Sequence, residues 1–278
     1  MTKLILLLSI IAGLESAFAQ NIDIDSLVYF DQDTAGLAKS IAADEAAWVY
    51  ADTTITWADT LREGNYDYID SYVAGMKKKY KNIPDLAKDI NLAFDTEQEK
   101  IRAIFIWMTN HIAYDYVELA NKNRSIGGSV SYSKGTPKFV IADKWEKIYF
   151  KYATKVLRDK RGICEGYATL FYELCRYTNV NCEMVTGFAD ENDEKIAKYK
   201  KQKYVPTNHA WNRVLLHGEW LYVDVTWASN GKYNTNRKRT EPIGYTPYYY
   251  LVKESNLYSD HIVNEKRSKR RNEVVGNY

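Results

Sequence analysis

The segment from residue 163 to residue 227 places one helical stretch directly before three extended stretches, and this order restricts the folds open to the chain. The helical stretch begins at Ile163 or Cys164, and its apolar stripe recurs at helical spacing through Tyr167, Phe171, Leu174 and Cys175. The extended stretches run from Cys182 to Phe188, from Asn208 to Leu216 and from Glu219 to Trp227. Helices followed by an antiparallel sheet are typical of an α+β fold.

Two more helices are predicted upstream of this segment. Thr96 and Glu99 form a capping-box pattern, and an apolar stripe through Ile101, Ile104, Phe105 and Met108 predicts an amphipathic helix ending near His111. A second helix is expected from about Asp143 to Arg158. Between the first two predicted strands, residues 189 to 206 form a charged, lysine-rich connection, and connections of that length are usually functional or disordered.

The last two predicted strands are joined by His217 and Gly218, a pair typical of a two-residue hairpin turn. With Leu216 opposite Glu219, the register places Trp211 opposite Asp224 and His209 opposite Thr226. His209 and Asp224 then share one face of the sheet as diagonal neighbours, with Cα atoms about 7 Å apart. An imidazole N–H can reach a carboxylate from that position.

Cys164 lies at the start of the third predicted helix, where a thiol can act as a nucleophile. A cysteine attacks as the thiolate, and its ordinary pKa near 8.5 must be lowered to make that form common. The helix dipole and the unpaired N–H groups of the first turn stabilise negative charge there, and Gly162 permits a tight entry into the helix. The backbone N–H of Cys164 also points to where an oxyanion would develop. Cys164, His209 and Asp224 therefore predict a nucleophile, a general base and a residue that orients the base.

Each of these residues also has a structural interpretation. A single cysteine at a helix start is often a small buried residue, a histidine on an aromatic strand is often a satisfied core residue, and Asp224 could hold a turn. The combination with same-face geometry favours catalysis. His111, His217 and His261 are weaker candidates, because they lie at a helix end, in a turn and near the tail. Zinc binding through the triad lacks C-x-x-C or H-x-x-x-H spacing, so neither a metal nor a cofactor is expected.

The other two cysteines leave a choice open. Cys175 and Cys182 are separated by a helix end and a strand start, a span that permits a disulfide without requiring one, and two buried thiols are the alternative. In both cases Cys164 is the unpaired thiol.

The N-terminus predicts export. Residues 1 to 19 contain a lysine, an apolar run and a small-x-small pattern before Gln20, as in a secretory signal, so a secreted or periplasmic protein is expected. No later stretch reaches the roughly 18 apolar residues of a transmembrane span. We predict an N-terminal extension, partly helical, over residues 20–90, a catalytic domain over residues 91–265 and a basic tail over residues 266–278.

Charge identifies no particular partner. The net charge is +2, and the basic runs at residues 77–81, 198–203 and 266–271 are most simply solvated surface, with anionic envelope polymers or nucleic acid as the alternative. No specific nucleic-acid contact is expected, and the expected partner is a protein or peptide substrate. The 24 tyrosines and seven tryptophans could line a glycan or peptide surface or fill the core.

Three motifs together resemble the transglutaminase-like superfamily, which is related to papain-type cysteine proteases: RGICEGYATLFYELC, CEMVTGFA and NHAWNRVLLHGEWLYVDVTWA. EKIRAIFIWMTNHIAYDY resembles the helix upstream of that family's cysteine. YYYLVKESNLYSDHIVNE resembles the closing segment of the branch that includes kyphoscoliosis peptidase and bacterial relatives, although the proline often found after its histidine is absent here. The resemblance covers Thr96 to Glu265.

The resemblance implies an α+β core in which the helix bearing Cys164 packs on an antiparallel sheet bearing His209 and Asp224. Glu165, Trp211 and Trp227 match motif positions and are expected to shape the substrate site or to pack the core. Trp145 and Tyr152 are candidates for the oxyanion side chain that this family often places upstream of its nucleophile.

Three functions compete. The first is a thiol hydrolase that cleaves peptide or isopeptide amides, with cell-envelope peptides as one substrate class. The second is acyl transfer to an amine, and the third is an exported binding or scaffold module that keeps the triad by ancestry.

Overall fold

The computed structural model describes residues 64–120, 138–234 and 239–275. The predicted signal sequence over residues 1–19 and residues 20–63 of the predicted N-terminal extension lie outside these residues. The helices are α4 (Asp67–Gly75), α5 (Ile83–Ala93), α6 (Glu97–His111), α7 (Tyr116–Ala120), α8 (Lys138–Asp159), α9 (Cys164–Tyr177), α10 (Asp193–Lys200), α11 (Val225–Ala228), α12 (Glu254–Leu257), α13 (Glu265–Val275) and the 3₁₀ turn η2 (Pro247–Tyr249). The strands are β1 (Ala113–Tyr114), β2 (Arg161–Gly162), β3 (Cys182–Ala189), β4 (His209–Leu216), β5 (Glu219–Val223), β6 (Ser229–Asn234), β7 (Arg239–Tyr245) and β8 (His261–Val263).

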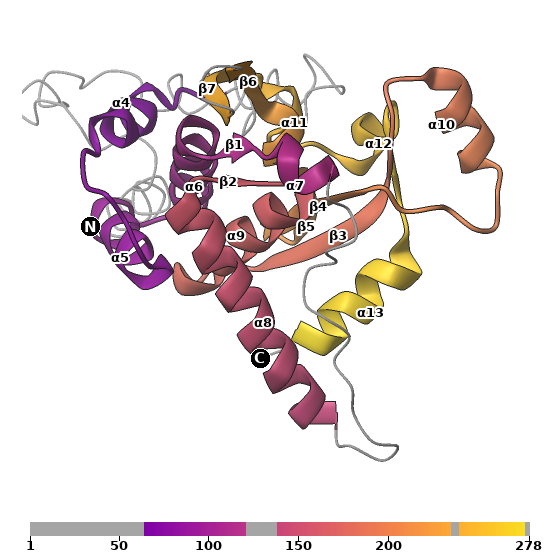
Figure 1. The fold of residues 1–278 in the computed structure, drawn as a ribbon, viewed down its shortest axis with the longest axis horizontal. Helices are drawn as coiled ribbons and strands as arrows, with labels where there is room; N and C mark the ends of the chain where they lie inside the picture. Colours follow the sequence, from indigo (N-terminus) through magenta and orange to yellow (C-terminus); the bar gives the residue numbers. More distant parts are fainter. Residues whose placement is uncertain (1–63, 121–137, 235–238, 276–278) are drawn as a thin grey trace, which may run out of the picture. The chain divides into compact units, whose positions relative to one another are not determined.

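The central sheet is antiparallel, in the order β5-β4-β3-β8, with α9 packed against it (Figure 1). Helices α4, α5, α6 and α9 share one hydrophobic cluster with β4 and β5. Two short pairs accompany the sheet, β1 with β2 in parallel and β6 with β7 in antiparallel orientation. The α+β architecture predicted from the order of elements is confirmed.

The hairpin between β4 and β5 has the predicted turn and register. His217 and Gly218 both have positive φ, at 50° and 82°, and Leu216 lies opposite Glu219. Strand β5 ends at Val223, however, four residues before the predicted end, so His209 has no strand partner at Thr226. Asp224 ends the strand because its Oδ1 accepts hydrogen bonds from the backbone N–H groups of Thr226 (2.9 Å) and Trp227 (3.1 Å) and caps α11.

Helix α6 begins with the predicted capping box, but it is buried on all sides rather than amphipathic. Ile101 to Thr109 are all buried. The one charged residue in that stretch, Arg102, donates to both carboxylate oxygens of Asp70 from α4, at 2.8 and 2.7 Å. Its guanidinium also lies over the rings of Tyr66 and Tyr250, so the charge is compensated inside the core.

Other boundaries differ modestly from prediction. Helix α8 begins at Lys138, five residues before the predicted start. The charged connection after β3 contains α10, whose Ile196 is buried against Phe188 and Ile262. The basic run at residues 266–271 lies within α13, which packs on β3 and α8. All three cysteines are free thiols, and burial, with Cys182 nearby, raises the pKa of the Cys175 thiol.

None of the helices in the described parts of the chain has the length and hydrophobicity of a membrane span.

Candidate active site

Cys164 is the first residue of α9, and the surrounding chain holds it in that place. Ile163, the N-cap residue, offers no side-chain cap, so no side chain occupies the N–H groups of the first turn from that position. Gly162 pairs with Tyr114 of β1, and this short parallel ladder aligns the entry into the helix. The Cys164 side chain is partly exposed, as a reactive thiol must be.

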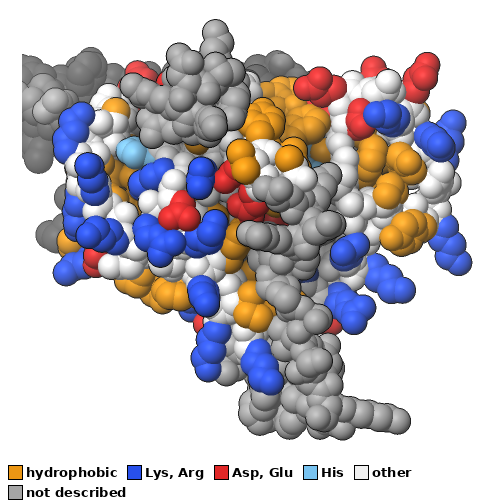
Figure 2. Space-filling model, in the orientation of Figure 1, with side chains coloured by type: hydrophobic (Ala, Val, Ile, Leu, Met, Phe, Trp, Pro, Cys, Tyr) orange, Lys and Arg blue, Asp and Glu red, His pale blue; other side chains and the backbone are white. Residues whose placement is uncertain are grey.

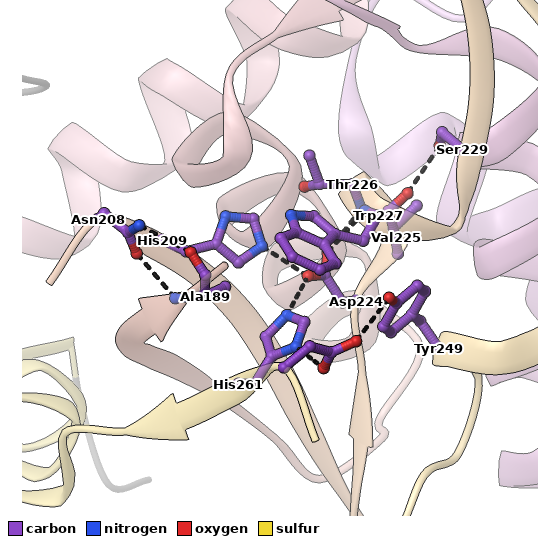
Figure 3. A network of polar contacts seen from close by, with 11 residues as sticks. Ala189, Asn208, His209, Asp224, Val225, Thr226, Trp227, Ser229, Tyr249 and His261 are labelled. Atoms are coloured by element: carbon purple, nitrogen blue, oxygen red, sulfur yellow. Dashed lines mark hydrogen bonds and ion pairs between the residues drawn. The ribbon is translucent and has the colours of Figure 1, made fainter. Parts of the chain in front are cut away.

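His209 is the first residue of β4, and its neighbour fixes the strand at this point. The Asn208 amide both donates to the Ala189 carbonyl and accepts from the Ala189 N–H, each at 2.8 Å (Figure 3). This double hydrogen bond joins the ends of β3 and β4. The His209 backbone therefore has a defined position although it lies at a strand end.

The His209 ring lies near both of its predicted partners. Its Nε2 is 2.5 Å from Oδ2 of Asp224, and Cys164 lies near enough to help raise the pKa of the ring. The structure thus brings together the three residues predicted to form the triad. His209 and Asp224 are in contact, as the hairpin register predicted, although Asp224 lies just beyond the end of β5. The His209 ring also stacks on Trp211 at 5.7 Å between centroids.

Electrostatics reinforce the pair. Burial lowers the pKa of His209, but the charge and hydrogen bond of Asp224, aided by Cys164, raise it to about 10. Burial likewise raises the pKa of Asp224, yet its contacts with His209 and His261 hold that pKa well below the usual range of an aspartate. At neutral pH the imidazole is therefore protonated and the carboxylate ionised.

His261, a weaker candidate by sequence, belongs to the same network. It is fully buried on β8, its Nε2 lies 3.1 Å from Oδ2 of Asp224, and its Nδ1 lies 2.5 Å from Oδ1 of Asp260. Asp260 in turn accepts a hydrogen bond from the Tyr249 hydroxyl at 2.8 Å. Figure 3 shows the resulting chain of contacts from His209 through Asp224 to Tyr249.

A close backbone approach makes this position of His261 possible. Strand β8 pairs with β3, where Gly187 lies opposite Val263. A Cβ atom on Gly187 would lie 2.1 Å from the Ile262 carbonyl oxygen and 2.6 Å from the Trp211 ring. Only glycine allows the two strands and the tryptophan to meet there.

The predicted substrate-site residues occupy three different environments. Trp211 is 1% exposed and packs against His209 and His261. Trp227 is partly exposed, with its ring 5.7 Å from His209 and 4.6 Å from His261. Glu165 is partly exposed and accepts a hydrogen bond from Arg271 of α13 at 2.9 Å.

The two oxyanion candidates differ as well. The Tyr152 hydroxyl donates to Glu118 at 2.9 Å, and burial together with that carboxylate raises the pKa of Tyr152. Trp145 stacks on Tyr149 and lines a neighbouring cleft. Tyr114, which sequence reasoning did not select, has its pKa raised first by burial and then by the nearby Cys164.

His209, Asp224 and His261 could in principle hold a metal ion, since one ligand atom from each lies within 4.8 Å of the others. However, both histidine Nε2 atoms are directed at the same carboxylate oxygen and are hydrogen-bonded to it. A cation between them would have to separate these contacts. The donor set is therefore engaged in an internal hydrogen-bond network.

Comparison with known proteins identifies the family of this chain. A family model for the transglutaminase-like superfamily matches residues 84–225. The chain belongs to this superfamily. It is 28% identical to human kyphoscoliosis peptidase over 201 residues, which are 72% of this chain and 26% of the relative. The mouse kyphoscoliosis peptidase is 29% identical over 182 residues, 66% of this chain and 23% of the relative.

A Caenorhabditis elegans Lim and transglutaminase domain protein is 24% identical over 187 residues, 63% of this chain and 21% of that protein. The chain thus spans about a quarter of the length of these curated relatives. A solved TGase structure is matched over 70% of this chain and 40% of that chain, at 16% identity and a TM-score of 0.29.

Proposed function

We propose that the protein is an exported cysteine-dependent acyl hydrolase that cleaves peptide or isopeptide amide bonds. The observation that carries the proposal is the position of the His209 ring, which lies 2.5 Å from Asp224 and close enough to Cys164 for both residues to raise its pKa. The predicted signal sequence before Gln20 supports export.

In the proposed reaction the Cys164 sulfur, as thiolate, attacks the amide carbonyl carbon and forms a tetrahedral intermediate. The backbone N–H groups at the start of α9 stabilise the oxyanion. His209, protonated beside Asp224, gives its proton to the leaving amine as the C–N bond breaks, which leaves a thioester on Cys164. Water then attacks the thioester while His209 accepts its proton, and the thiolate leaves as the carboxylic acid forms.

Asp224 and the aromatic residues have supporting roles in this scheme. Asp224 keeps a proton on Nε2 of His209 and stabilises the imidazolium. Trp211 and Trp227 hold the imidazole ring in place. Because Trp227 and Glu165 are partly exposed, we assign them, rather than the buried Trp211, to direct substrate contact.

Alkylation of the native protein by iodoacetamide, with the modified sites mapped by mass spectrometry, tests the nucleophile. Cys182 is an internal control, because it is partly exposed like Cys164 but lies opposite Val214, further along β4 from His209. We expect Cys164 to react faster than Cys182 below pH 7, and His209→Ala to remove the difference. Equal rates at the two thiols, unchanged by His209→Ala, would refute the catalytic proposal.

Acyl transfer to an amine is the second candidate function, favoured by membership of the superfamily. The two reactions share the thioester and differ in whether water or an amine attacks it. A screen of peptide amides with and without a labelled primary amine separates them, with Cys164→Ala as the control for contaminating enzymes. A product that carries the labelled amine, formed in place of a free carboxylate, would show that the protein catalyses acyl transfer.

A further inference from the structure

A cleft of about 850 Å³ opens beside the proposed nucleophile, between α13, the start of α9 and the chain that follows α10. Its volume lies in the range of pockets that hold small ligands or short peptide segments. Glu165, which directly follows Cys164, is part of its wall. A group bound in the cleft would therefore lie close to an amide held at the thiol.

The cleft is strongly basic. Its lining includes Lys203, Lys266, Arg267, Arg270 and Arg271. Figure 2 shows Lys and Arg side chains gathered on the surface around α13. Much of the basic run at residues 266–271, which was predicted to be solvated surface, thus lies on one wall of the cleft.

Most of this charge is uncompensated within the part of the chain that the structure describes. Lys203, Lys266 and Arg270 are exposed, and no carboxylate of the described residues forms an ion pair with them. Arg267 donates to the Thr207 hydroxyl at 2.8 Å, which leaves its charge unbalanced. Of the two acidic residues in the lining, Glu265 is 3.3 Å from Arg213, outside the cleft. Clustered like charges of this kind attract and concentrate anions.

Arg271 connects the cleft to the active site. Its side chain is 10% exposed, with the guanidinium over the Tyr149 ring at 5.1 Å. One terminal nitrogen donates to Glu165 at 2.9 Å and the other to Thr186 at 3.4 Å. The basic wall is therefore fixed to the first turn of α9 and to β3, the strand that pairs with His209.

We propose that this cleft binds the carboxylate side chains of an acidic peptide and so selects substrates with acidic residues beside the amide that Cys164 attacks. The proposal rests on the proposed function. A peptide fits better than a phosphate polymer, because the lining also has aromatic surfaces from Trp145 and Tyr149 and the negative charge of Glu265.

Two thiol-reactive peptides of equal length, one with two glutamates and one with two glutamines beside a chloromethyl ketone, provide the main test. We expect the glutamate probe to label Cys164 at least ~5-fold faster at low salt, since screened charge pairs are individually weak but add over several contacts. Lys203→Gln with Arg270→Gln should reduce the ratio to about 2 or less, by the same estimate. Lys269→Gln removes an exposed charge from the same helix, outside the lining, and should leave the ratio unchanged. Equal labelling rates, or equal effects of the cleft and control variants, would overturn the proposal.

Binding separates this proposal from the proposed function. The Cys164→Ala protein is titrated into a fluorescent glutamate peptide and its glutamine counterpart, and anisotropy is measured. Tighter binding of the glutamate peptide, weakened by the cleft variants, would support an acidic-peptide site in the cleft. This result would hold even if Cys164 is unreactive towards iodoacetamide. Rapid iodoacetamide labelling without any preference for the glutamate peptide would support Cys164 as the nucleophile and refute the proposal that the cleft binds acidic peptides. An oligonucleotide that displaces the glutamate peptide at lower concentration than unlabelled peptide would also overturn it, because the site would then be one for polyanions.

Discussion

Replacing Asp224 by asparagine isolates the charge that the site depends on. The asparagine side chain would keep an Oδ1 acceptor for the N–H groups of Thr226 and Trp227, so the cap of α11 is preserved. What is lost is the negative charge 2.5 Å from the His209 ring. Asp224→Ala is the comparison variant, because it removes the cap as well, at about 1 kcal/mol.

The structure gives the direction and size of the effect on His209. Burial alone lowers the pKa of this imidazole, and Asp224 is the main cause of its rise to about 10. In Asp224→Asn we expect the pKa to fall to 6.5 or below. A fall of that size corresponds to roughly 5 kcal/mol of interaction, at ~1.4 kcal/mol per unit. At pH 7.5 the ring changes from protonated to mostly neutral, and the asparagine amide favours the tautomer with Nδ1 protonated, which cannot accept a proton from Cys164.

The assay is an NMR titration of the His209 ring, together with the turnover rate of any substrate found. Loss of the correct tautomer in triads of this kind costs on the order of 10⁴ in kcat. A His209 pKa that stays near 10 in Asp224→Asn, with turnover within a few-fold of wild type, would refute the assignment of Asp224 as the orienting residue.

The same shift predicts how stability depends on pH. Because the pKa of His209 is raised in the folded state, its contribution to the free energy of unfolding is complete below about pH 6.5. This contribution is lost as the pH rises through about 10. Thermal denaturation of the wild type should therefore show falling stability across this window. Asp224→Asn should give a flatter profile there, and identical profiles would contradict the linkage.

Three further outcomes are expected. Gly187→Ala should destabilise the protein by about 1–3 kcal/mol or more in urea unfolding, because its Cβ would overlap the Ile262 carbonyl, whereas Gly75→Ala, which meets nothing within 4 Å, should be neutral or slightly stabilising. His261→Ala removes one buried hydrogen bond to the Asp224 carboxylate, a loss of about 1–3 kcal/mol. Alkylation of Cys164 below pH 7 should therefore slow by roughly 5- to 100-fold. Circular dichroism should show that the variant stays folded. Treatment with a chelator should leave the alkylation rate of Cys164 unchanged, and a loss that added zinc restores would instead assign the histidine cluster to a metal.

Local signals predicted the part of the site that lies on adjacent elements. The capping box at Thr96 and the helix start at Cys164 are set by nearby residues. The register of the hairpin follows from two turn residues and strict alternation, so the contact of His209 with Asp224 could be deduced without a structure. The end of β5 was missed because the side chain of Asp224 competes with strand pairing for the backbone N–H groups that follow it.

His261 could not be deduced in this way, because its place depends on long-range strand pairing. Strand β8 is three residues long and joins β3 across more than 70 residues of chain. The signals that could have identified it were the Asp260–His261 pair within the closing motif and Gly187 inside a predicted strand, since an interior glycine often marks a close backbone approach. The course of α13 was missed for a similar reason, because the contact of Arg271 with Glu165 links residues 106 apart in sequence.

The network around Asp224 explains why the site needs a complete sheet. Asp224 Oδ1 caps α11, while Oδ2 receives one histidine from β4 and another from β8. The carboxylate can hold the His209 ring only if β5 stops at Val223, and its second support exists only if β8 pairs with β3. The first condition is met by a local hydrogen bond from Thr226 to Asp224, and the second by long-range strand pairing. The nucleophile at α9 therefore acquires its partners only when the strands on both sides of β3 are in place, which couples the proposed activity to the folding of the whole domain.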